Sequence, residues 1–171
     1  MINDPLAAVI WGIITRKDFD IQLIEQELIA HFGKIIHRSQ PLEFNYTDYY
    51  EKEMGKDLIR YWLMTEKLVS LTEIAQIKNF ARTIEQKYLT DERRRVNLDP
   101  GFITLSNFIL ATTKNYAHRI YLGNKIFAEV TLIFRNRSFQ ALDWTYPDYK
   151  NAIEYFNQAR TIYKQLLHNL R

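Results

Sequence analysis

The chain of 171 residues contains no cysteine. This absence excludes disulfide bonds, thiolate metal ligands and cysteine nucleophiles. Glycine is scarce as well, with 5 residues, and neither GxxxxGK[ST] nor GxGxxG occurs. Because these two patterns form the glycine-rich loops that hold phosphates, the familiar loop-type nucleotide-binding sites are excluded.

Signatures of metalloproteases and serine hydrolases are missing too. Neither HExxH nor GxSxG occurs. The four histidines are His31, His37, His118 and His168, and no two of them have the spacing of a helical ligand pair. Any metal would have to be held mainly by carboxylates, so we predict no metal site, and the sequence points to no particular cofactor.

The chain also lacks a long hydrophobic run and an excess of one charge. Its apolar run Leu6–Thr15 is about half as long as a membrane span, and it has neither the basic start nor the cleavage site of a signal peptide. We therefore expect a soluble cytoplasmic protein without a membrane partner. With 23 basic and 20 acidic residues, the net charge is +3, which makes nucleic acid a less favoured partner than a small molecule.

What the sequence does contain is typical of a globular protein. Apolar residues make up 47%, charged residues 25% and aromatic residues 14%. The length suits one domain, and no repeat, linker or low-complexity segment divides it. We predict a single globular domain over residues 1–171.

The periodicity of apolar residues predicts an alternation of strands and helices. β-branched residues indicate a central strand at Val9–Thr15, and a helix with apolar residues at helical spacing follows and ends at Gly33. A further strand is predicted at Leu58–Val69, and Ser70 with Glu73 forms a capping box that begins the next helix. Together with a later β-meander and a last helix, this order predicts an α+β two-layer sandwich. Its sheet would be antiparallel or mixed, with helices on one face and a ferredoxin-like core.

The meander contains a clear hairpin signal. Gly123-Asn124 lies between two β-rich arms and favours a two-residue turn, which pairs His118 with Glu129. Alternate residues from Ile126 to Phe134 then form an apolar face, with His118 and Glu129 on the opposite face. A second turn is predicted at Asn136-Arg137.

The first candidate site is the stretch "ERRRVNLDPGFITLSN" (Glu92 to Asn107). Pro100 and Gly101 after Asp99 are typical of a tight turn. Arg95, Asn97 and Asp99 would project beside it as a fork for a phosphate or carboxylate. The simpler alternative is an exposed turn flanked by solvated arginines.

The second candidate is "TTKNYAHR", in which hydroxyl and basic side chains gather within eight residues. Thr113, Lys114, His118 and Arg119 could grip an anion, and Glu129 beside His118 would orient the imidazole for acid–base chemistry. The alternative is a surface ion pair worth less than about 1 kcal/mol.

The third candidate consists of "FNYTDYYEKE" and "WTYPDYK". Asp48 and Asp148 are most simply carboxylates at helix starts, with Thr47 as the cap of a short helix that ends at Gly55. Nearby tyrosines could instead wall a pocket that stacks a ring. The acid–base candidates are therefore His118, Glu129, Asp99 and Asp48, and the ligand-binding candidates are Arg95, Asn97, Lys114, Arg119, Thr113, Tyr49 and Tyr146.

The phrases "FNYTDYYEKEMG", "RRVNLDPGFITL", "LATTKNYAHRIYLGNKIFAEVTLIF" and "WTYPDYK" also occur in this order over nearly the whole chain. In this the chain resembles the uncharacterised prokaryotic family catalogued as domain of unknown function 4416. The resemblance implies a stand-alone single-domain protein and brings no established activity or catalytic residues. Some members carry a GTP-binding label, which this sequence does not support because it has no phosphate loop. Since the signature phrases coincide with the three candidate sites, we expect these to converge on one surface.

Three hypotheses for the function follow. The first is a protein that binds or acts on an anionic small molecule, phosphorylated or nucleotide-like, in a polar pocket. The second is an RNA-associated module, favoured by arginines and aromatic residues but opposed by the interleaved acidic residues. The third is a structural or partner-binding protein, such as an oligomer, whose polar clusters serve only folding.

Overall fold

The computed structural model describes residues 4–170, which form an α+β protein with nine strands in one sheet and five α-helices. The sheet order is β2-β4-β1-β5-β6-β8-β7, while β3 pairs with β4 and β9 with β8. All paired strands are antiparallel. The strands are β1 (Leu6–Arg16), β2 (Ile35–Arg38), β3 (Leu42–Glu43), β4 (Leu58–Ser70), β5 (Val96–Ile103), β6 (Asn107–Thr112), β7 (Ile120–Gly123), β8 (Ile126–Arg135) and β9 (Ser138–Ala141). The helices are α1 (Gln22–Phe32), α2 (Glu51–Met54), α3 (Ile74–Lys87), α4 (Pro147–Asn151) and α5 (Ile153–His168).

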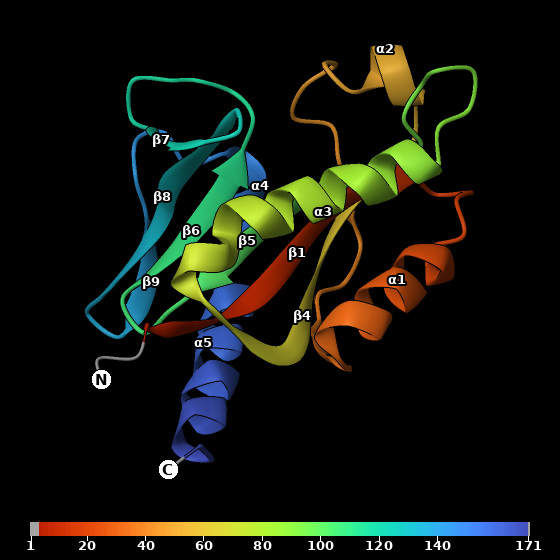
Figure 1. The fold of residues 1–171 in the computed structure, drawn as a ribbon. Coiled ribbons are helices and arrows are strands. Elements are labelled where there is room, and N and C mark those ends of the chain that lie inside the picture. Colours follow the sequence, from red (N-terminus) through yellow and green to blue (C-terminus); the bar gives the residue numbers. More distant parts are fainter. Residues whose placement is uncertain (1–3, 171) are drawn as a thin grey trace.

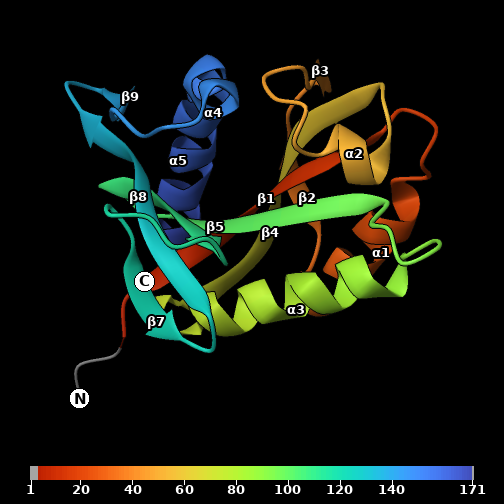
Figure 2. The same ribbon diagram turned by 90° about the horizontal axis from the view of Figure 1, so that it is seen from above.

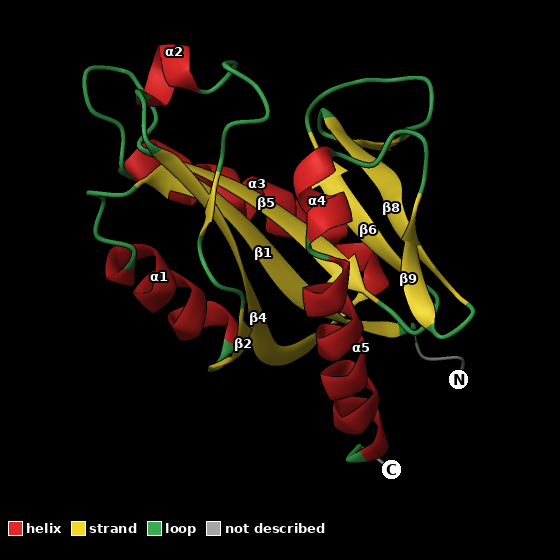
Figure 3. Cartoon of the chain, turned by 180° about the vertical axis from the view of Figure 1, so that it is seen from behind, coloured by secondary structure: helices red, strands yellow, loops and turns green. Residues whose placement is uncertain are grey.

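Helices cover both faces of this sheet, as Figures 1 and 2 show. α1 and α3 lie on one face, and α4 and α5 lie on the other, which Figure 3 shows from behind. The expectation of helices on one face only is therefore wrong. The physical reason is visible in β1, where residues 7–15 are all buried. A strand that is apolar on both sides needs a packed layer on each face.

The two faces of β1 belong to two separate hydrophobic clusters. Trp11 and Ile13 pack in the cluster that contains residues of α1 and α3. Ala8 and Ile10 pack in the cluster that contains Phe156 and other residues of α5. The central position of the predicted first strand is confirmed, because β1 pairs with β4 on one side and β5 on the other.

The helix signals in the sequence are confirmed for the long helices. α1 ends at Gly33, whose φ of 77° is available to glycine at low cost. The predicted capping box is present, with the Ser70 side chain and Glu73 both engaged. The last helix is divided in two at Ala152, where φ is −109° and ψ is 15°. No helix within residues 4–170 has the length and apolar character needed to cross a membrane.

The predicted turn at Asp99, Pro100 and Gly101 is wrong, because β5 runs straight through it. Asp99 pairs with Gly12 and Pro100 with Trp11 in the ladder with β1. β6 pairs with β5 only from Gly101 onward, so the strand has no second neighbour at Pro100, where a proline without an N–H is tolerated. The chain turns earlier instead, at residues 91 and 92, both of which have positive φ.

The hairpin turn exists, but its register differs from the prediction. Asn124 and Lys125, with φ of 51° and 62°, occupy the two turn positions, and Tyr121 pairs with Phe127. The second turn, at residues 136 and 137, is confirmed by its positive φ values. The predicted apolar face of β8 is wrong, because its alternate residues do not stay on one face of the sheet, and Glu129 and Thr131 between them are buried as well. A register shift in the pairing of β6 with β8 separates Ile126, in the α1–α3 cluster, from Leu132, in the α5 cluster.

Candidate functional site

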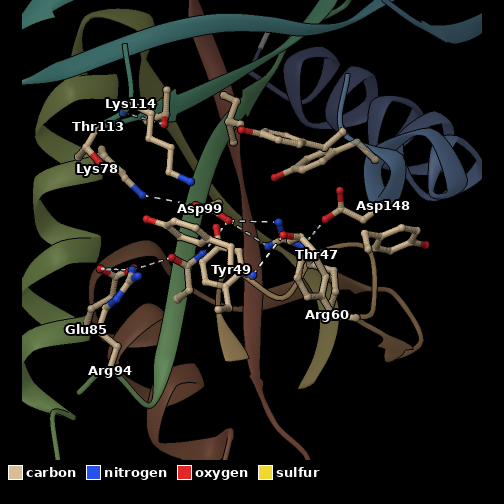
Figure 4. Close-up of a pocket in the computed structure, with 18 of the residues that line it drawn as sticks. Thr47, Tyr49, Arg60, Lys78, Glu85, Arg94, Asp99, Thr113, Lys114 and Asp148 are labelled. Carbon is tan, nitrogen blue, oxygen red and sulfur yellow. Dashed lines mark hydrogen bonds and ion pairs between the residues drawn. The ribbon is translucent and has the colours of Figure 1, made fainter. Parts of the chain in front are cut away.

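A polar cavity of about 600 Å³ opens at one end of the sheet. Its walls come from the loop of residues 44–50, from α3, from the end of β6 with the loop after it, and from α4, while β4 and β5 provide the floor (Figure 4). This volume falls within the range of small-molecule sites. Segments that are far apart in the sequence therefore meet around one hollow.

The centre of the cavity is a buried ion-pair network around Arg60. Its guanidinium Nε donates to Asp148 Oδ2 at 2.8 Å, and Nη1 donates to Asp99 Oδ2 at 3.1 Å. The Arg60 side chain is only 4% exposed. Gly12 lies directly beneath it, and a Cβ at this position would lie 2.9 Å from Arg60 Nη1. Glycine in the central strand thus provides the space for the buried guanidinium.

Asp99 is the carboxylate that joins the walls of the cavity. Besides Arg60, it accepts a hydrogen bond of 2.8 Å from Asn97 Nδ2, and its Oδ1 lies 3.5 Å from Lys78 Nζ. The Lys78 ammonium also donates to the Leu98 carbonyl at 2.8 Å. Burial raises the pKa of Asp99, but Lys78 and Arg60 outweigh burial and hold this pKa below its usual value.

This arrangement predicts a contribution of Asp99 to acid stability. Because the pKa is lower in the folded state, ionised Asp99 stabilises the fold above the ordinary value of 3.8, and this stabilisation is lost as the pH falls through the folded value. We expect Asp99→Asn to lose less unfolding free energy than the parent protein between about pH 5 and about pH 2. Urea unfolding at each pH measures this, with Asp48→Asn as an exposed carboxylate control. Equal losses in the parent protein and Asp99→Asn would contradict the prediction.

Arg94 connects the short helix α2 to β5 at the edge of the cavity. Its Nε donates to Glu53 Oε1 at 2.9 Å and its Nη2 to Glu53 Oε2 at 2.8 Å, while Nη1 donates to Asn97 Oδ1 at 2.9 Å. Such a two-point pairing fixes orientation as well as distance. Nearby Glu85 accepts the Leu98 N–H at 2.7 Å, and burial raises the pKa of Glu85.

Some basic side chains of the cavity have no carboxylate partner. Within residues 4–170, Arg82, Lys114 and Lys125 line the cavity without an ion pair to any acidic side chain. The Lys114 ammonium lies 4.1 Å from the centre of the Tyr49 ring, an arrangement typical of a cation–π contact. Positive charge is therefore available in the cavity for an anion.

The sequence of this chain matches a known protein family over most of its length. The model of the family described as domain of unknown function (DUF4416) matches residues 5–163. The chain belongs to the DUF4416 family. The match extends from the residue before β1 into α5, so it contains every element that lines the cavity. No curated protein and no solved structure matches the chain.

In this DUF4416 protein, six of the residues selected from the sequence line the cavity. They are Asn97, Asp99, Thr113, Lys114, Tyr49 and Tyr146. Asp48 and Arg95 do not line it. Asp48 is exposed in the loop before α2, and because that helix begins at Glu51, Thr47 caps no helix and accepts the Tyr49 N–H instead.

Arg95 is displaced because it lies in a bend just before β5, where strand alternation has not begun. Its carbonyl accepts a hydrogen bond from the Thr15 hydroxyl at 2.9 Å. Of the consecutive arginines, Arg94 reaches the cavity instead. The sequence suggested the correct cluster of residues and the wrong member.

His118, Glu129 and Arg119 form a second cluster behind the cavity wall, since none of them lines the cavity. His118 Nε2 lies 2.7 Å from Glu129 Oε1, so the expected pair forms although it is not a cross-strand pair. Arg119 donates to Glu129 Oε1, to the Lys114 carbonyl at 2.9 Å and to the Tyr146 hydroxyl at 3.2 Å. The cluster thus holds two residues that do line the cavity.

The sequence interpretation missed several charged residues of the cavity. Lys78 and Glu85 lie on the buried side of α3, among its apolar positions, and Arg60 lies within the strand β4. A charged residue on an otherwise apolar helix face was the available signal, because such residues are rarely buried without a partner. Among residues 4–170 no group of three or more potential metal ligands is arranged to hold a metal ion.

Proposed function

We propose that this cavity binds a small anionic molecule of phosphorylated or nucleotide-like chemistry. The observation that carries the proposal is the presence of basic side chains, Lys114 and Arg82 among them, that have no carboxylate partner in the described part of the chain and line a cavity of about 600 Å³. An unpaired ammonium or guanidinium group in a concave site favours an anionic ligand. No reaction is assigned by this arrangement.

Aromatic side chains support the nucleotide-like part of the proposal. Tyr49, Tyr116 and Tyr146 line the cavity and are 55%, 51% and 38% exposed. Exposed tyrosines in a concave site offer ring faces for stacking and hydroxyls for hydrogen bonds. A ligand that combines a charged group with a ring would use both kinds of side chain.

The connectivity supports a ferredoxin-like core as part of the same proposal. The elements β1, α1, β2, β4, α3 and β5 follow the order of a split β-α-β pair. Their strands are adjacent in the order β2-β4-β1-β5, with α1 and α3 packed on the same face. Strands β6, β7, β8 and β9 extend this core beyond β5, while β3 pairs with β4, and the cavity lies where core and extension meet. A fold of this kind supports many functions and selects none of them.

Lys114 provides the direct test of anion binding. Bound ligand raises the melting temperature by mass action, so thermal shift identifies ligands in a panel of inorganic phosphate, ribose 5-phosphate and nucleoside monophosphates. We expect Lys114→Ala to weaken the best of them about tenfold, because a charge-assisted contact is lost. Titration calorimetry at two salt concentrations measures the affinity.

Lys164→Ala is the matched control, because Lys164 is exposed on α5 and remote in sequence from the cavity lining. Its affinity should equal that of the parent protein. The absence of a thermal shift for the whole panel would refute the proposal. Retardation of single-stranded RNA that weakens steeply with salt, without any response to small phosphates, would favour the RNA-associated alternative.

A further inference from the structure

The cavity has two chemically different ends. In Figure 4, Lys78, Thr113 and Lys114 lie at one end and Asp148 lies at the other, with Asp99 between them. A basic end and an acidic end separated by the body of the cavity would orient an elongated ligand. Which part of the ligand lies at which end depends on the side chains that are free to bind it.

At the basic end, Lys78 is already occupied. Its ammonium donates to the Leu98 carbonyl and pairs with Asp99. Lys114 has no such carboxylate partner within residues 4–170, and neither has Arg82, one helical turn beyond Lys78 on α3. Lys114 and Arg82 are therefore the groups at this end that can hold the anionic part of a ligand.

At the opposite end, only one of the two carboxylate oxygens of Asp148 accepts a hydrogen bond from residues 4–170. This residue is 3% exposed, and its Oδ2 accepts from Arg60 Nε, but its Oδ1 accepts no hydrogen bond from any residue between 4 and 170. Among residues 4–170 the buried hydroxyl of neighbouring Tyr149 has no hydrogen-bond partner. Asp148 Oδ1 is not fully buried, so it remains accessible from the cavity that Asp148 lines, and a ligand N–H or O–H can donate to it.

Aromatic side chains lie near this acidic end. The centre of the Phe44 ring lies 5.8 Å from the Arg60 guanidinium carbon, and the Tyr46 hydroxyl accepts a hydrogen bond from Asn151 of α4. Phe44, Tyr46 and Tyr146 line the cavity together with Asp148. Phe44 and Tyr46 contact each other edge to face with ring centres 5.8 Å apart. A flat ring placed here would lie against aromatic side chains and present its edge to Asp148.

Resting on the proposed function, we infer that the ligand is a nucleoside phosphate whose base carries an exocyclic amine. The phosphate binds at Lys114 and Arg82, and the amine donates to Asp148 Oδ1. An amine is the N–H group that adenine, cytosine and guanine present at their edges. A polar site of this kind discriminates strongly against an analogue that lacks the group it bonds.

The test compares AMP, CMP and GMP with ribose 5-phosphate by titration calorimetry of the full chain. We expect at least one of these nucleotides to bind about tenfold more tightly than ribose 5-phosphate. The tightest is then compared with its analogue that has hydrogen in place of the amine, which is the 5′-phosphate of purine riboside, pyrimidin-2-one riboside or inosine. This analogue should bind about tenfold more weakly than the parent nucleotide.

Asp148→Asn should reduce the difference in affinity between the nucleotide and its amine-free analogue. Asp48→Asn is the matched control and should preserve the difference, because Asp48 lies outside the cavity. If Asp148→Asn does not fold, the affinities of the parent protein for the nucleotide and for its amine-free analogue still test the inference. Equal affinity for the nucleotide and its amine-free analogue would overturn the inference. Ribose 5-phosphate binding as tightly as every nucleotide would also overturn it, yet would leave anion binding in place.

Discussion

Replacement of Arg60 by methionine is expected to lower the free energy of unfolding by about 3–5 kcal/mol. The guanidinium is the shared partner of Asp99 and Asp148, and both carboxylates lie in a region from which water is largely excluded. Methionine would keep much of the side-chain volume but leave Asp148 without its cation and Asp99 with Lys78 as its remaining cation. The cost of burying an unpaired charge therefore exceeds the loss of packing.

Urea unfolding near neutral pH measures this effect, and Arg38→Met provides the control. Arg38 also pairs with a carboxylate, Glu25, and the two side chains are 51% and 12% exposed, so its removal should cost less than removal of Arg60, which is 4% exposed and serves two carboxylates. Adding Asp148→Asn to Arg60→Met should recover part of the lost stability, because the uncompensated charge of Asp148 disappears. If Arg60→Met and Arg38→Met cost the same, the buried network is not the main support of the cavity.

Replacement of Gly101 by alanine is expected to cost about 3 kcal/mol through overpacking. A Cβ at this position would lie 2.3 Å from Phe108 Cζ and 2.8 Å from the Ile109 carbonyl oxygen. Phe108 is fully buried in the α5 cluster and cannot move aside freely. Because β5 and β6 pair at Gly101 and Leu110, the strain would also reach the ladder beside the cavity.

Thermal or urea unfolding measures this loss, and a second substitution tests its cause. Phe108→Leu removes the ring atoms that the new methyl group would meet. We expect Gly101→Ala with Phe108→Leu to be more stable than the sum of the two single changes predicts, since contacting residues do not contribute additively. Strict additivity would show that the cost does not arise from the contact with Phe108.

Local signals in the chain were sufficient for the regular elements. The apolar run of β1, the capping box of Ser70 and Glu73 and the last helix each depend on residues close together in sequence, and the structure confirms all three. Turn chemistry was less reliable. Asp99, Pro100 and Gly101 have the composition of a turn, but pairing with β1 outweighs that local preference and keeps the strand extended.

For the candidate site, residue types could be predicted but not the network that joins them. Asn97, Asp99, Lys114, Tyr49 and Tyr146 were selected as polar or aromatic groups in loops and strand ends, and the structure brings them to one cavity. The sequence does not show which carboxylate faces which cation, because that depends on the register of strands and on bends. Arg94 lines the cavity in place of the predicted Arg95, which is the next residue in the chain. The register of the hairpin places His118 and Glu129 behind the cavity wall.

By itself the sequence determined the α+β character, the positions of the long elements and the family to which the chain belongs, because these depend on periodicity, caps and long matching phrases. Only the tertiary structure decided that both sheet faces carry helices and that Arg60 lies between Asp99 and Asp148. The contact between Arg60 and Asp148 joins residues 88 positions apart, and the contact between Tyr163 of α5 and Leu6 of β1 joins residues 157 positions apart. Side chains at such separations meet only after strand pairing and helix packing have selected one arrangement for the whole chain.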